Sequence, residues 1–572
     1  MDRIITSYLT EFQKTYNFES EISQSTLFEH FVNYVVTESK LEDSLDEEQI
    51  EKICIGRNGT IGLDGFALII NGHLITEKED LDSILDLNKN SKAELIFIQS
   101  KTSSSFNIKE IGLFGDTIED FISETPKYDW TENARACIDL FNQLLNRVSE
   151  LAENPKCYLY YVTLGLLEEN QNLIAQKEKI ISKIKAQNVF SAVEFKYIDN
   201  SSLQSDFKKI GQSIAKSFEF TNKVLIPDIT NVTESHIGVI PSKTIVDLMT
   251  DEDGEIINNL FYDNVRDFQG DNKINNKIEE TLDDMSIRDA FSILNNGITI
   301  VAEEIKHTRN IVTITNYQFI NGLQTSHVLF NKKESLTNEI QVPLKLIITK
   351  NEDLISKIIR STNSQTPVSE EDLIAYSGFQ KRLEDFYKTF SDCEKLYYER
   401  RSKQYNKTSI ERKKIVDKTT QIKAIGSMVH HKPNMATRYF GTLLKEFGNS
   451  LFQDNHKMIP YYTCAFVLFK LEELFRTNQI DKKYRKLRFF ILMMIGLEIS
   501  TLGFPKFESQ NVEVFCQSIL EKVKNEVEFK SLIKNTLNKI DSLNEDLNSL
   551  ELSKSRKLVD DLKAFYFPKT KS

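Results

Sequence analysis

The chain has 572 residues, of which 40% are hydrophobic and 27% are charged. This length is enough for about three or four domains and this composition is that of ordinary globular protein, so a peptide-sized or disulfide-stapled fold is excluded. The six cysteines lie far apart, without the close pairs of a zinc knuckle or redox motif, so we expect reduced thiols. The formal net charge is −12, so any nucleic-acid binding must come from a local basic patch or a bound metal.

The sequence indicates neither export nor membrane insertion. Its first residues, MDRIITSYLTEF, lack the basic region and the unbroken apolar core of a secretory signal. The longest apolar run, at 489–497, is too short to cross a bilayer. We therefore expect a cytoplasmic protein without a membrane partner.

Helices and strands alternate in the N-terminal part of the chain. Apolar residues recur at helical spacing in 5–16 and 26–39, which predicts two opening helices. The apolar stretch 66–70, the turn Asn71-Gly72 and the alternating stretch 93–101 predict a β-meander. A helix at 131–150, a strand at 157–163, a helix at 173–187 and a strand at 192–198 complete the unit.

The pattern changes twice further along the chain. Short strands and turns from about residue 223 indicate an α+β domain, and beyond about residue 394 helical periodicity dominates. The strands are expected at 297–301, 311–314, 317–320 and 342–349, and the helices at 354–362, 463–476, 486–500, 512–527 and 543–565. The fold class is therefore α/β, with a mixed-sheet domain at 1–222, a central α+β domain at 223–395 and a helical domain at 396–572.

A set of polar side chains in the N-terminal domain suits metal-assisted hydrolysis. Because side chains alternate along the strand at 93–101, Gln99 and Lys101 share one face. If this strand pairs with the one that begins near Asp64, a carboxylate, an amide oxygen and an ammonium group converge at one end of a sheet. Carboxylate and amide oxygens are ligands for Mg²⁺ or Mn²⁺, and Lys101 would orient or deprotonate water and stabilise charge on a phosphate. The alternative is a half-buried hairpin in which Lys101 is a solvated strand end.

These residues resemble the restriction-endonuclease-like PD-(D/E)xK superfamily. The resemblance rests on a helix with Phe28-Glu29, then Gly-Leu-Asp-Gly at 62–65, then Ile-Gln-Ser-Lys at 98–101. It implies a nuclease-like fold for the first domain, with Glu29, Asp64 and Gln99 as metal ligands, Mg²⁺ or Mn²⁺ as cofactor and Lys101 as a further catalytic residue. Gln99 replaces the commoner acidic residue and removes one negative charge from the site.

Four ordered motifs in the middle of the chain resemble the AIPR family, named for abortive-infection phage resistance. They are NNGITI (295–300), FINGLQT (319–325), STNSQ (361–365) and YYERR (397–401), with further matches at NVRD (264–267) and QIK (421–423). The resemblance covers roughly residues 220 to 430. Members of this family often join such a region to an endonuclease-like N-terminal domain, which supports the interpretation of the first domain. The resemblance to the family also implies a role in antiviral defence.

The same motifs offer a polar pocket. Asn321-Gly322 is a turn after a strand, and Thr325 or Ser326 could cap the next helix and leave its first N–H groups free for an anion. The pocket for a nucleotide, phosphate or base edge would be formed by Asn296, Asn321, Gln324, Thr325, Asn363 and Gln365. Alternatively these amides are structural and fix turns. The arrangement also resembles, more weakly, the ParB and DndB-type nucleotide-binding proteins.

A basic segment follows at 399–423. Nine basic and three acidic residues give it a local charge of +6, with Tyr405 within it and Tyr397 and Tyr398 directly before it. This composition favours a phosphate-tracking surface, with a solvated helix face carrying local ion pairs as the alternative. The nucleic-acid contacts are expected at Arg400, Arg401, Lys413 and Lys414.

Two functions are therefore in competition. The first is an antiphage effector whose N-terminal domain is a metal-dependent endonuclease that cleaves DNA, while the other domains bind nucleic acid or a phage-derived trigger and restrain cutting. Paired sites in a homodimer would suit double-strand cleavage. The second is a nucleotide-gated, ParB/DndB-like DNA-binding regulator with a degenerate nuclease domain. A third possibility is toxicity by sequestration of a host partner through the helical domain.

Overall fold

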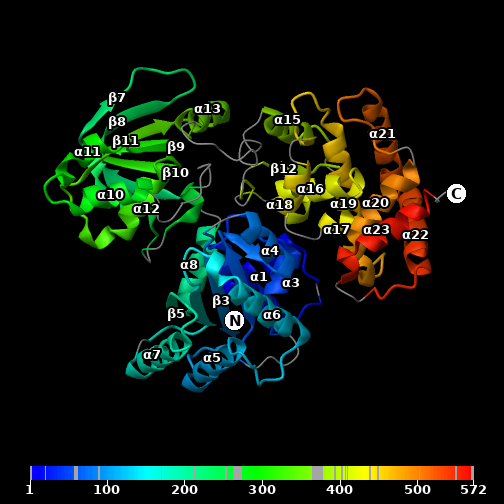
Figure 1. Cartoon of the computed structure of the whole chain (residues 1–572), viewed down its shortest axis with the longest axis horizontal. Coiled ribbons are helices and arrows are strands. Elements are labelled where there is room, and N and C mark those ends of the chain that lie inside the picture. Colours follow the sequence, from blue (N-terminus) through cyan, green and yellow to red (C-terminus); the bar gives the residue numbers. More distant parts are fainter. Residues whose placement is uncertain are drawn as a thin grey trace.

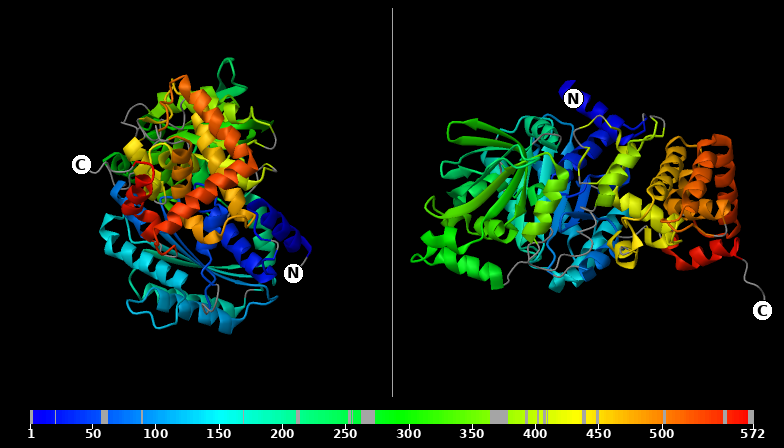
Figure 2. Two further views of the ribbon diagram at one scale, coloured as in Figure 1. Left: turned by 90° about the vertical axis from the view of Figure 1, so that its right-hand side faces the viewer. Right: turned by 90° about the horizontal axis from the view of Figure 1, so that it is seen from above.

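The computed structural model describes most of the chain in three parts (Figure 1). The described residues are 3–19, 21–56, 62–87, 90–168, 170–210, 214–251, 254, 256–261, 273–363, 378–391, 394–400, 403–405, 408, 410–436, 440–447, 450–500, 503–547 and 551–567. Seen from above, the N-terminal part lies between the central sheet domain and the helical domain (Figure 2).

The N-terminal part is built on one mixed sheet with the strand order β2-β1-β3-β4-β5. Strand β1 is antiparallel to β2 and β3, whereas β3, β4 and β5 are parallel. Its elements are α1 (Arg3–Tyr16), α2 (Gln24–Glu38), α3 (Glu47–Ile53), β1 (Gly65–Ile70), β2 (His73–Ile75), α4 (Lys78–Leu87), β3 (Ala93–Lys101), α5 (Ile108–Phe121), α6 (Glu132–Asn146), β4 (Lys156–Thr163), α7 (Gln171–Lys185), β5 (Ala192–Ile198) and α8 (Asn200–Ile210). The expected strands and helices of this part are confirmed, but the β-meander is wrong because α4 separates β2 from β3 and β2 lies at the edge of the sheet.

The alternation along β3 is also confirmed, because its two faces enter different cores. Leu95 and Phe97 pack with residues of α4, α5, α6 and α7. Ile96 and Ile98 pack on the other side with residues of α1, α2, α3 and α8. Gln99 and Lys101 therefore lie on the α5 side of the sheet, at its end.

The central part is a six-stranded sheet with the order β6-β10-β9-β11-β8-β7. Its elements are β6 (Ala215–Glu219), β7 (Lys223–Leu225), β8 (Glu234–Pro241), α9 (Ser242–Met249), α10 (Lys273–Asp283), α11 (Phe291–Leu294), β9 (Ile298–Thr308), β10 (Ile311–Asn321), α12 (Leu323–Asn331), β11 (Gln341–Ile348) and α13 (Glu352–Asn363). Helices α9, α10 and α12 pack on one face of this sheet, and α13 packs on the other. Since β6 pairs with β10, the second unit begins before residue 222. The two short strands expected at 311–314 and 317–320 are one strand, β10, which passes through Asn316 at a φ of 50°.

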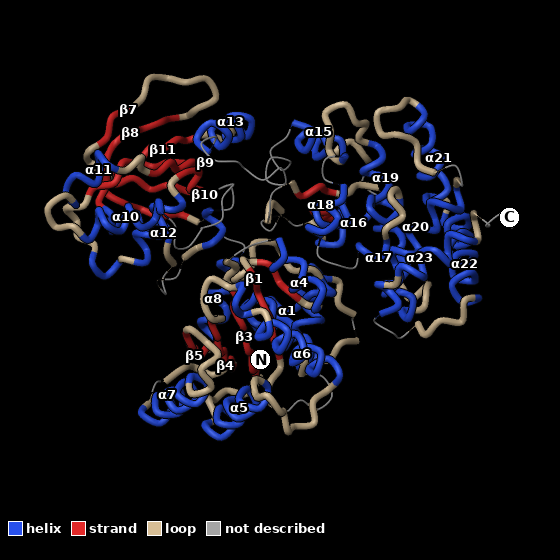
Figure 3. Tube along the Cα trace, viewed as in Figure 1, coloured by secondary structure: helices blue, strands red, loops and turns tan. Residues whose placement is uncertain are grey.

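The C-terminal part is mainly helical (Figure 3). Its elements are α15 (Gly378–Tyr387), β12 (Tyr397–Glu399), β13 (Ile415–Asp417), α16 (Lys418–Met428), α17 (Pro433–Ala436), α18 (Phe440–Phe447), α19 (Ile459–Arg476), α20 (Arg488–Ile499), α21 (Asn511–Lys524), α22 (Glu526–Ser542) and α23 (Arg556–Ala564). The helix expected at 543–565 is wrong, since α22 ends at Ser542, Asn544 has a φ of 53° and α23 begins only at Arg556. Helix α15 belongs to the helical core through Phe379 and Leu383, so this domain begins before residue 396.

The longest apolar run of the sequence lies in α20. Its side chains from Phe489 to Leu497 are buried in the helical core, which explains why α20 has no polar face. Among the described residues, no helix combines the length and the apolar character needed to cross a membrane.

Candidate active site

Asp64 lies immediately before β1 and is held by its backbone on two sides. Its N–H donates to the carbonyl of Ile98 on β3 at 2.9 Å. Its own carbonyl accepts hydrogen bonds from the N–H groups of Ile55 and Gly56 at 3.0 and 3.2 Å. The side chain is only 8% exposed, so the fold places one carboxylate inside the domain at the end of the sheet.

The carboxylate of Asp64 meets the end of β3. Its Oδ2 accepts hydrogen bonds from Gln99 Nε2 at 2.5 Å, from Ser100 N at 2.8 Å and from Ser100 Oγ at 3.1 Å. Lys101 follows on the same face as Gln99, and its charge acts on Asp64. The structure therefore brings Asp64, Gln99 and Lys101 together, as the pairing of the two strands requires.

Burial sets the electrostatics of this pair. Burial raises the pKa of Asp64 above its usual value, against the opposing effects of the Lys101 charge and of the Ser100 and Gln99 hydrogen bonds. Gln99 is 1% exposed, and among the described residues its Oε1 has no hydrogen-bond partner. A buried oxygen without a donor is costly, so this oxygen is suited to accept a cation or a further donor.

We predict that Asp64→Asn stabilises the protein at pH 7. The folded state of Asp64 has a raised pKa, so it binds a proton more tightly than the unfolded state, and ionisation of Asp64 costs stability at a pH above that pKa. The neutral amide removes this cost while its oxygen can still accept from Ser100 N. Thermal unfolding measured against pH should show a higher Tm for the variant at pH 7 and a shrinking difference as the pH falls toward 3.8, the ordinary pKa of the side chain. A lower Tm at pH 7 would contradict the assigned cost.

Asn33 of α2 is a neighbour of the site that the sequence did not reveal. Its Nδ2 donates to the Asp64 carbonyl at 3.4 Å and to Cys54 Sγ at 3.1 Å. Glu29, the expected additional metal ligand, is half-buried one helical turn before Asn33, on the same side of α2. The sequence holds one signal for this contact. A glycine directly after Asp64 indicates that another group approaches the backbone closely there, and that group is the Asn33 side chain.

The close approach at Gly65 gives a second prediction. A Cβ at Gly65 would lie 2.2 Å from Asn33 Oδ1, so Gly65→Ala must displace the buried Asn33 side chain, and with it the contacts of that side chain with the Asp64 carbonyl and Cys54, or shift the start of β1. We expect a loss of about 1–3 kcal/mol in stability, as for other overpacked cores, together with misplacement of Asp64. Gly112→Ala is the control, because its Cβ would meet only the end of the Gln176 side chain at 3.2 Å within a helix. Equal thermal stability of both variants would show that the contact is not tight.

Tyr161 and Glu110 lie on the same face of the sheet and were also missed by the sequence. Tyr161 is the β4 partner of Gln99, and its hydroxyl donates to Glu110 Oε2 on α5 at 3.3 Å. Burial, followed by the charges of Glu110 and Asp64, raises the pKa of Tyr161. A second carboxylate and a phenol therefore lie near the Asp64 end of the sheet.

The motif residues of the central domain are held by short-range hydrogen bonds. Asn295 donates through Nδ2 to Thr325 Oγ1 at 3.2 Å and accepts through Oδ1 from Gly297 N at 2.8 Å. Thr325 and Ser326 lie within α12, which begins at Leu323, so the expected helix cap at Thr325 or Ser326 is wrong. Gly322, with a φ of 95°, is the N-cap residue of α12.

The expected pocket is only partly present. Asn296 is exposed, and it is the neighbouring Asn295 that contacts Thr325. Asn321 accepts a hydrogen bond from Gly322 N at 2.5 Å, which fits the structural alternative for these amides, and Gln324 is half-buried in α12. The side chain of Asn363 and the whole of Gln365 lie outside the described residues.

The basic segment at 399–423 forms a joint between domains. Arg400 is 4% exposed and its Nε donates to Glu384 at 3.2 Å, so its expected role as a phosphate contact is wrong. Lys403 Nζ donates to the carbonyls of Glu38 and Leu41 in the N-terminal domain at 2.9 and 2.7 Å. Arg400 and Lys403 therefore pair with buried groups of the protein, which the charge of the segment alone could not indicate.

Arg412 and Lys413 of this segment also have partners within the protein. Arg412 donates to Glu399 Oε2 at 3.2 Å and to the Ser44 carbonyl of the N-terminal domain at 3.3 Å. Lys413 pairs with Glu411 at 2.6 Å, and Lys414 is half-buried beside it. Arg401 lies outside the described residues.

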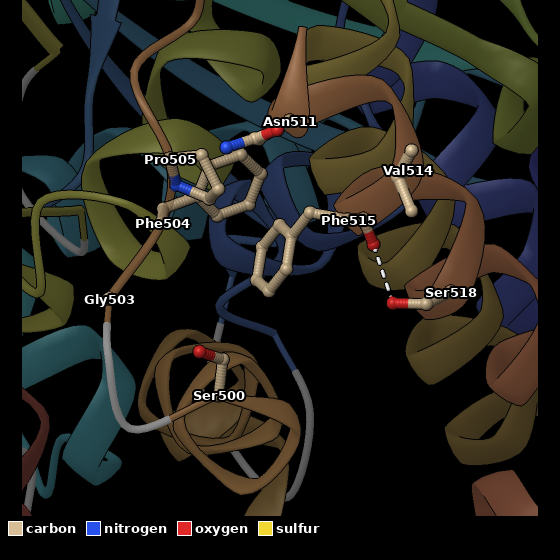
Figure 4. Close-up of a pocket in the computed structure, with 8 residues that line it drawn as sticks. All are labelled: Ser500, Gly503, Phe504, Pro505, Asn511, Val514, Phe515 and Ser518. Atoms are coloured by element: carbon tan, nitrogen blue, oxygen red, sulfur yellow. Dashed lines mark hydrogen bonds between the residues drawn. The ribbon is translucent and has the colours of Figure 1, made fainter. Parts of the chain in front are cut away.

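A separate cavity of about 520 Å³ lies in the helical domain between the end of α20 and α21 (Figure 4). Phe504, Pro505, Val514 and Phe515 give it an apolar lining, with Asn511 at its rim. None of its lining residues belongs to the Asp64 site, so the cavity is not evidence for or against hydrolysis at that site.

The fold and the site together define a mixed α/β protein with a buried carboxylate–amide pair at a sheet end and a helical domain docked beside it. Residues 261–550, half of the chain, match the sequence profile of the family described as AIPR protein, and the chain belongs to the AIPR family. Membership suggests a role in antiphage abortive infection. The match begins later and extends further into the helical domain than the four motifs indicated. No curated protein and no solved structure matches the chain.

Proposed function

We propose that this AIPR protein is a metal-dependent endonuclease that cleaves DNA by phosphodiester hydrolysis in antiphage defence. The N-terminal domain, on this proposal, has a restriction-endonuclease-like fold. The observation that carries the proposal is the contact of Asp64 with Gln99 at the end of β1 and β3, with Lys101 on the same face. The family supports the defence role, and the site supports the chemistry.

The residues of the site fit a divalent cation with oxygen ligands. Asp64 and Gln99, with Glu29 from α2, would hold Mg²⁺ or Mn²⁺, which prefer such oxygens. Because Nε2 of Gln99 now faces Asp64, sharing an ion requires the amide to turn, and its Oε1 gives up no hydrogen bond when it does so. When bound, the ion would polarise the phosphate and favour ionisation of a coordinated water.

The protein side chains have distinct parts in this proposal. Ser100 fixes the orientation of the Asp64 carboxylate through two hydrogen bonds, so one oxygen of that group is held in place. The ammonium group of Lys101 would orient the attacking water and stabilise the negative charge that develops on the phosphate. Burial around Asp64 keeps bulk water away, which strengthens both interactions.

The other two domains would regulate cutting by holding the N-terminal domain and by binding nucleic acid or a phage-derived trigger. Lys403 and Arg412 bond to backbone carbonyls at the end of α2 and in the α2–α3 connection. On the central domain, burial and the charge of Lys92 from the N-terminal domain lower the pKa of His327 in α12 to about 3. A homodimer would supply one site for each strand of a duplex.

The experiment that tests this function uses the purified full chain. Supercoiled plasmid, linear DNA and RNA are each incubated with Mg²⁺, with Mn²⁺ or with EDTA. We expect cleavage of DNA that depends on the added metal. If none of the substrates is cut under any of these conditions, and ATP or another nucleotide binds in calorimetry instead, the endonuclease proposal fails and the nucleotide-gated regulator takes its place.

A further inference from the structure

Three metal-ligating side chains meet in the central domain, far along the chain from Asp64. Glu234 Oε1 lies 2.5 Å from His236 Nε2 and 2.8 Å from His307 Nε2. All three ligand atoms lie within 4.8 Å of one another. The side chains are 25%, 5% and 36% exposed, respectively, so the cluster opens to solvent on the His307 side.

The sheet topology explains why these residues meet. Strand β11 lies between β8 and β9, and it ends at Ile348, which pairs with Glu234 on one side and with Ala302 on the other. Strand β9 continues beyond Ala302 along β10 as far as Thr308, so His307 lies past the end of β11. Because β11 has ended there, the side chain of His307 on β9 reaches Glu234 on β8, and β8, β11 and β9 belong to one sheet (Figure 1).

We propose that Glu234, His236 and His307 form a binding site for Zn²⁺ or a similar transition metal ion. Two imidazole nitrogens and one carboxylate oxygen are a ligand set that Zn²⁺ takes in three-residue sites, with water in the fourth position. At metal–ligand distances of about 2.0–2.1 Å the ligand atoms stand roughly 3.3 Å apart. The two contacts of Glu234 therefore need to open by less than about 1 Å, which its partly exposed side chain permits.

The surroundings of the two imidazoles decide which nitrogen can bind. His236 packs edge-on against Phe220, and its Nε2–H donates to Glu234 Oε1 in the metal-free protein. Its buried Nδ1 has no hydrogen-bond partner among the described residues, so the ring can carry its proton on Nδ1 when Nε2 binds a metal. Lys223 Nζ lies 3.4 Å from His307 Nδ1, and an ammonium group there donates to that nitrogen and keeps the proton on Nε2.

A metal ion bound by Glu234, His236 and His307 would have a structural effect that a metal ion at the Asp64 site would not have. It would join β8 to the part of β9 that extends beyond β11 and so hold one end of the six-stranded sheet. The proposal does not depend on nuclease activity, because the ligands, the domain and the kind of metal all differ from those of the proposed catalytic site.

The test is a titration of metal-free full-length chain with Co²⁺, followed by displacement with Zn²⁺. We expect one Co²⁺ per chain to show the strong visible absorption of a four-coordinate ion, which an ion on the oxygen ligands proposed at Asp64 would not show. We also expect loss of that absorption with Zn²⁺ and a rise in Tm with Zn²⁺. His236→Gln and His307→Gln should each weaken binding by more than about 100-fold, since even indirect partners of a ligand contribute 10–100-fold. His307 is partly exposed, so its variant keeps the fold and remains informative if His236→Gln unfolds.

Two further variants make the outcome specific. His73→Gln is the matched control, since His73 lies near two carboxylates, Glu42 and Asp43, with no second imidazole among the described residues at metal-ligand distance. His73→Gln should bind Co²⁺ like the parent, whereas Lys223→Gln should bind it more tightly. The proposal is overturned if the parent shows no such absorption or if His307→Gln binds as the parent does. Unchanged affinity in Lys223→Gln would overturn the assignment of Nε2 as the ligand atom of His307.

Discussion

Lys101→Ala is expected to slow metal-dependent DNA cleavage by at least about 100-fold, the range for loss of one group that acts on the attacking water. Asp64→Ala is expected to abolish cleavage at the same metal concentration, because it removes the only charged group of the Asp64–Gln99 pair. Both effects follow from the position of these residues at one end of the sheet. Initial rates of plasmid nicking, measured over a range of Mn²⁺ concentrations, separate a loss of metal affinity from a loss of chemistry.

The control for this pair is Lys179→Ala. Lys179 is an exposed lysine of α7 in the same domain, so its loss changes net charge and general DNA affinity by the same amount without touching the site. It should cut within about threefold of the parent, since surface substitutions of this kind are usually mild. If Asp64→Ala and Lys101→Ala cut as well as Lys179→Ala, the site is wrongly assigned.

Arg412→Ala is expected to destabilise the protein by about 3–5 kcal/mol, the cost of removing one partner of a buried ion pair. Its partner Glu399 is 3% exposed, and the variant would leave that carboxylate buried opposite the empty position. Arg412 also bonds to Ser44 O, so its loss removes a contact between the helical and N-terminal domains. Urea unfolding followed by tryptophan fluorescence and by circular dichroism measures the change.

Two variants show whether the ion pair is the cause. Lys414→Ala removes a half-buried cation from the same short 3-10 helix, Arg412–Lys414, and should stay within about 0.5–1 kcal/mol of the parent. The double variant Glu399→Gln/Arg412→Met should recover part of the loss, because it no longer leaves a buried charge unpaired. A urea midpoint for Arg412→Ala equal to that of Lys414→Ala would contradict a structural role for this pair.

Local pattern was enough to predict most of the N-terminal sheet and the approach of Asp64 to Gln99. The alternation along β3 fixed which side chains face α5, and strand pairing then placed the end of β3 beside the start of β1. Asn33 was not predictable in this way, because its contact with the Asp64 carbonyl depends on how α2 packs on the sheet. Periodicity identifies the buried face of a helix but not the partner of each residue on it.

The basic segment shows a different limit of sequence reasoning. Lys403 and Glu38 are 365 residues apart in the chain, and no local signal indicates that one bonds to the backbone of the other. A run of basic residues predicts positive charge, but whether that charge faces solvent or a buried carboxylate depends on domain docking. The start of α12 also differs from the prediction. The sequence predicts a capping side chain at Thr325 or Ser326, whereas the N-cap residue is Gly322, whose φ is positive.

The most direct measurement is a crystal structure of the full chain with Mn²⁺, read from its anomalous scattering. Sharing of one ion by Asp64 and Gln99 predicts an anomalous peak within about 2.5 Å of a carboxylate oxygen of Asp64 and of Gln99 Oε1, with the amide turned so that Oε1 and not Nε2 faces Asp64. An intact 2.5 Å bond between Gln99 Nε2 and Asp64, with no peak beside it at a Mn²⁺ concentration that supports cleavage, would contradict the proposed site.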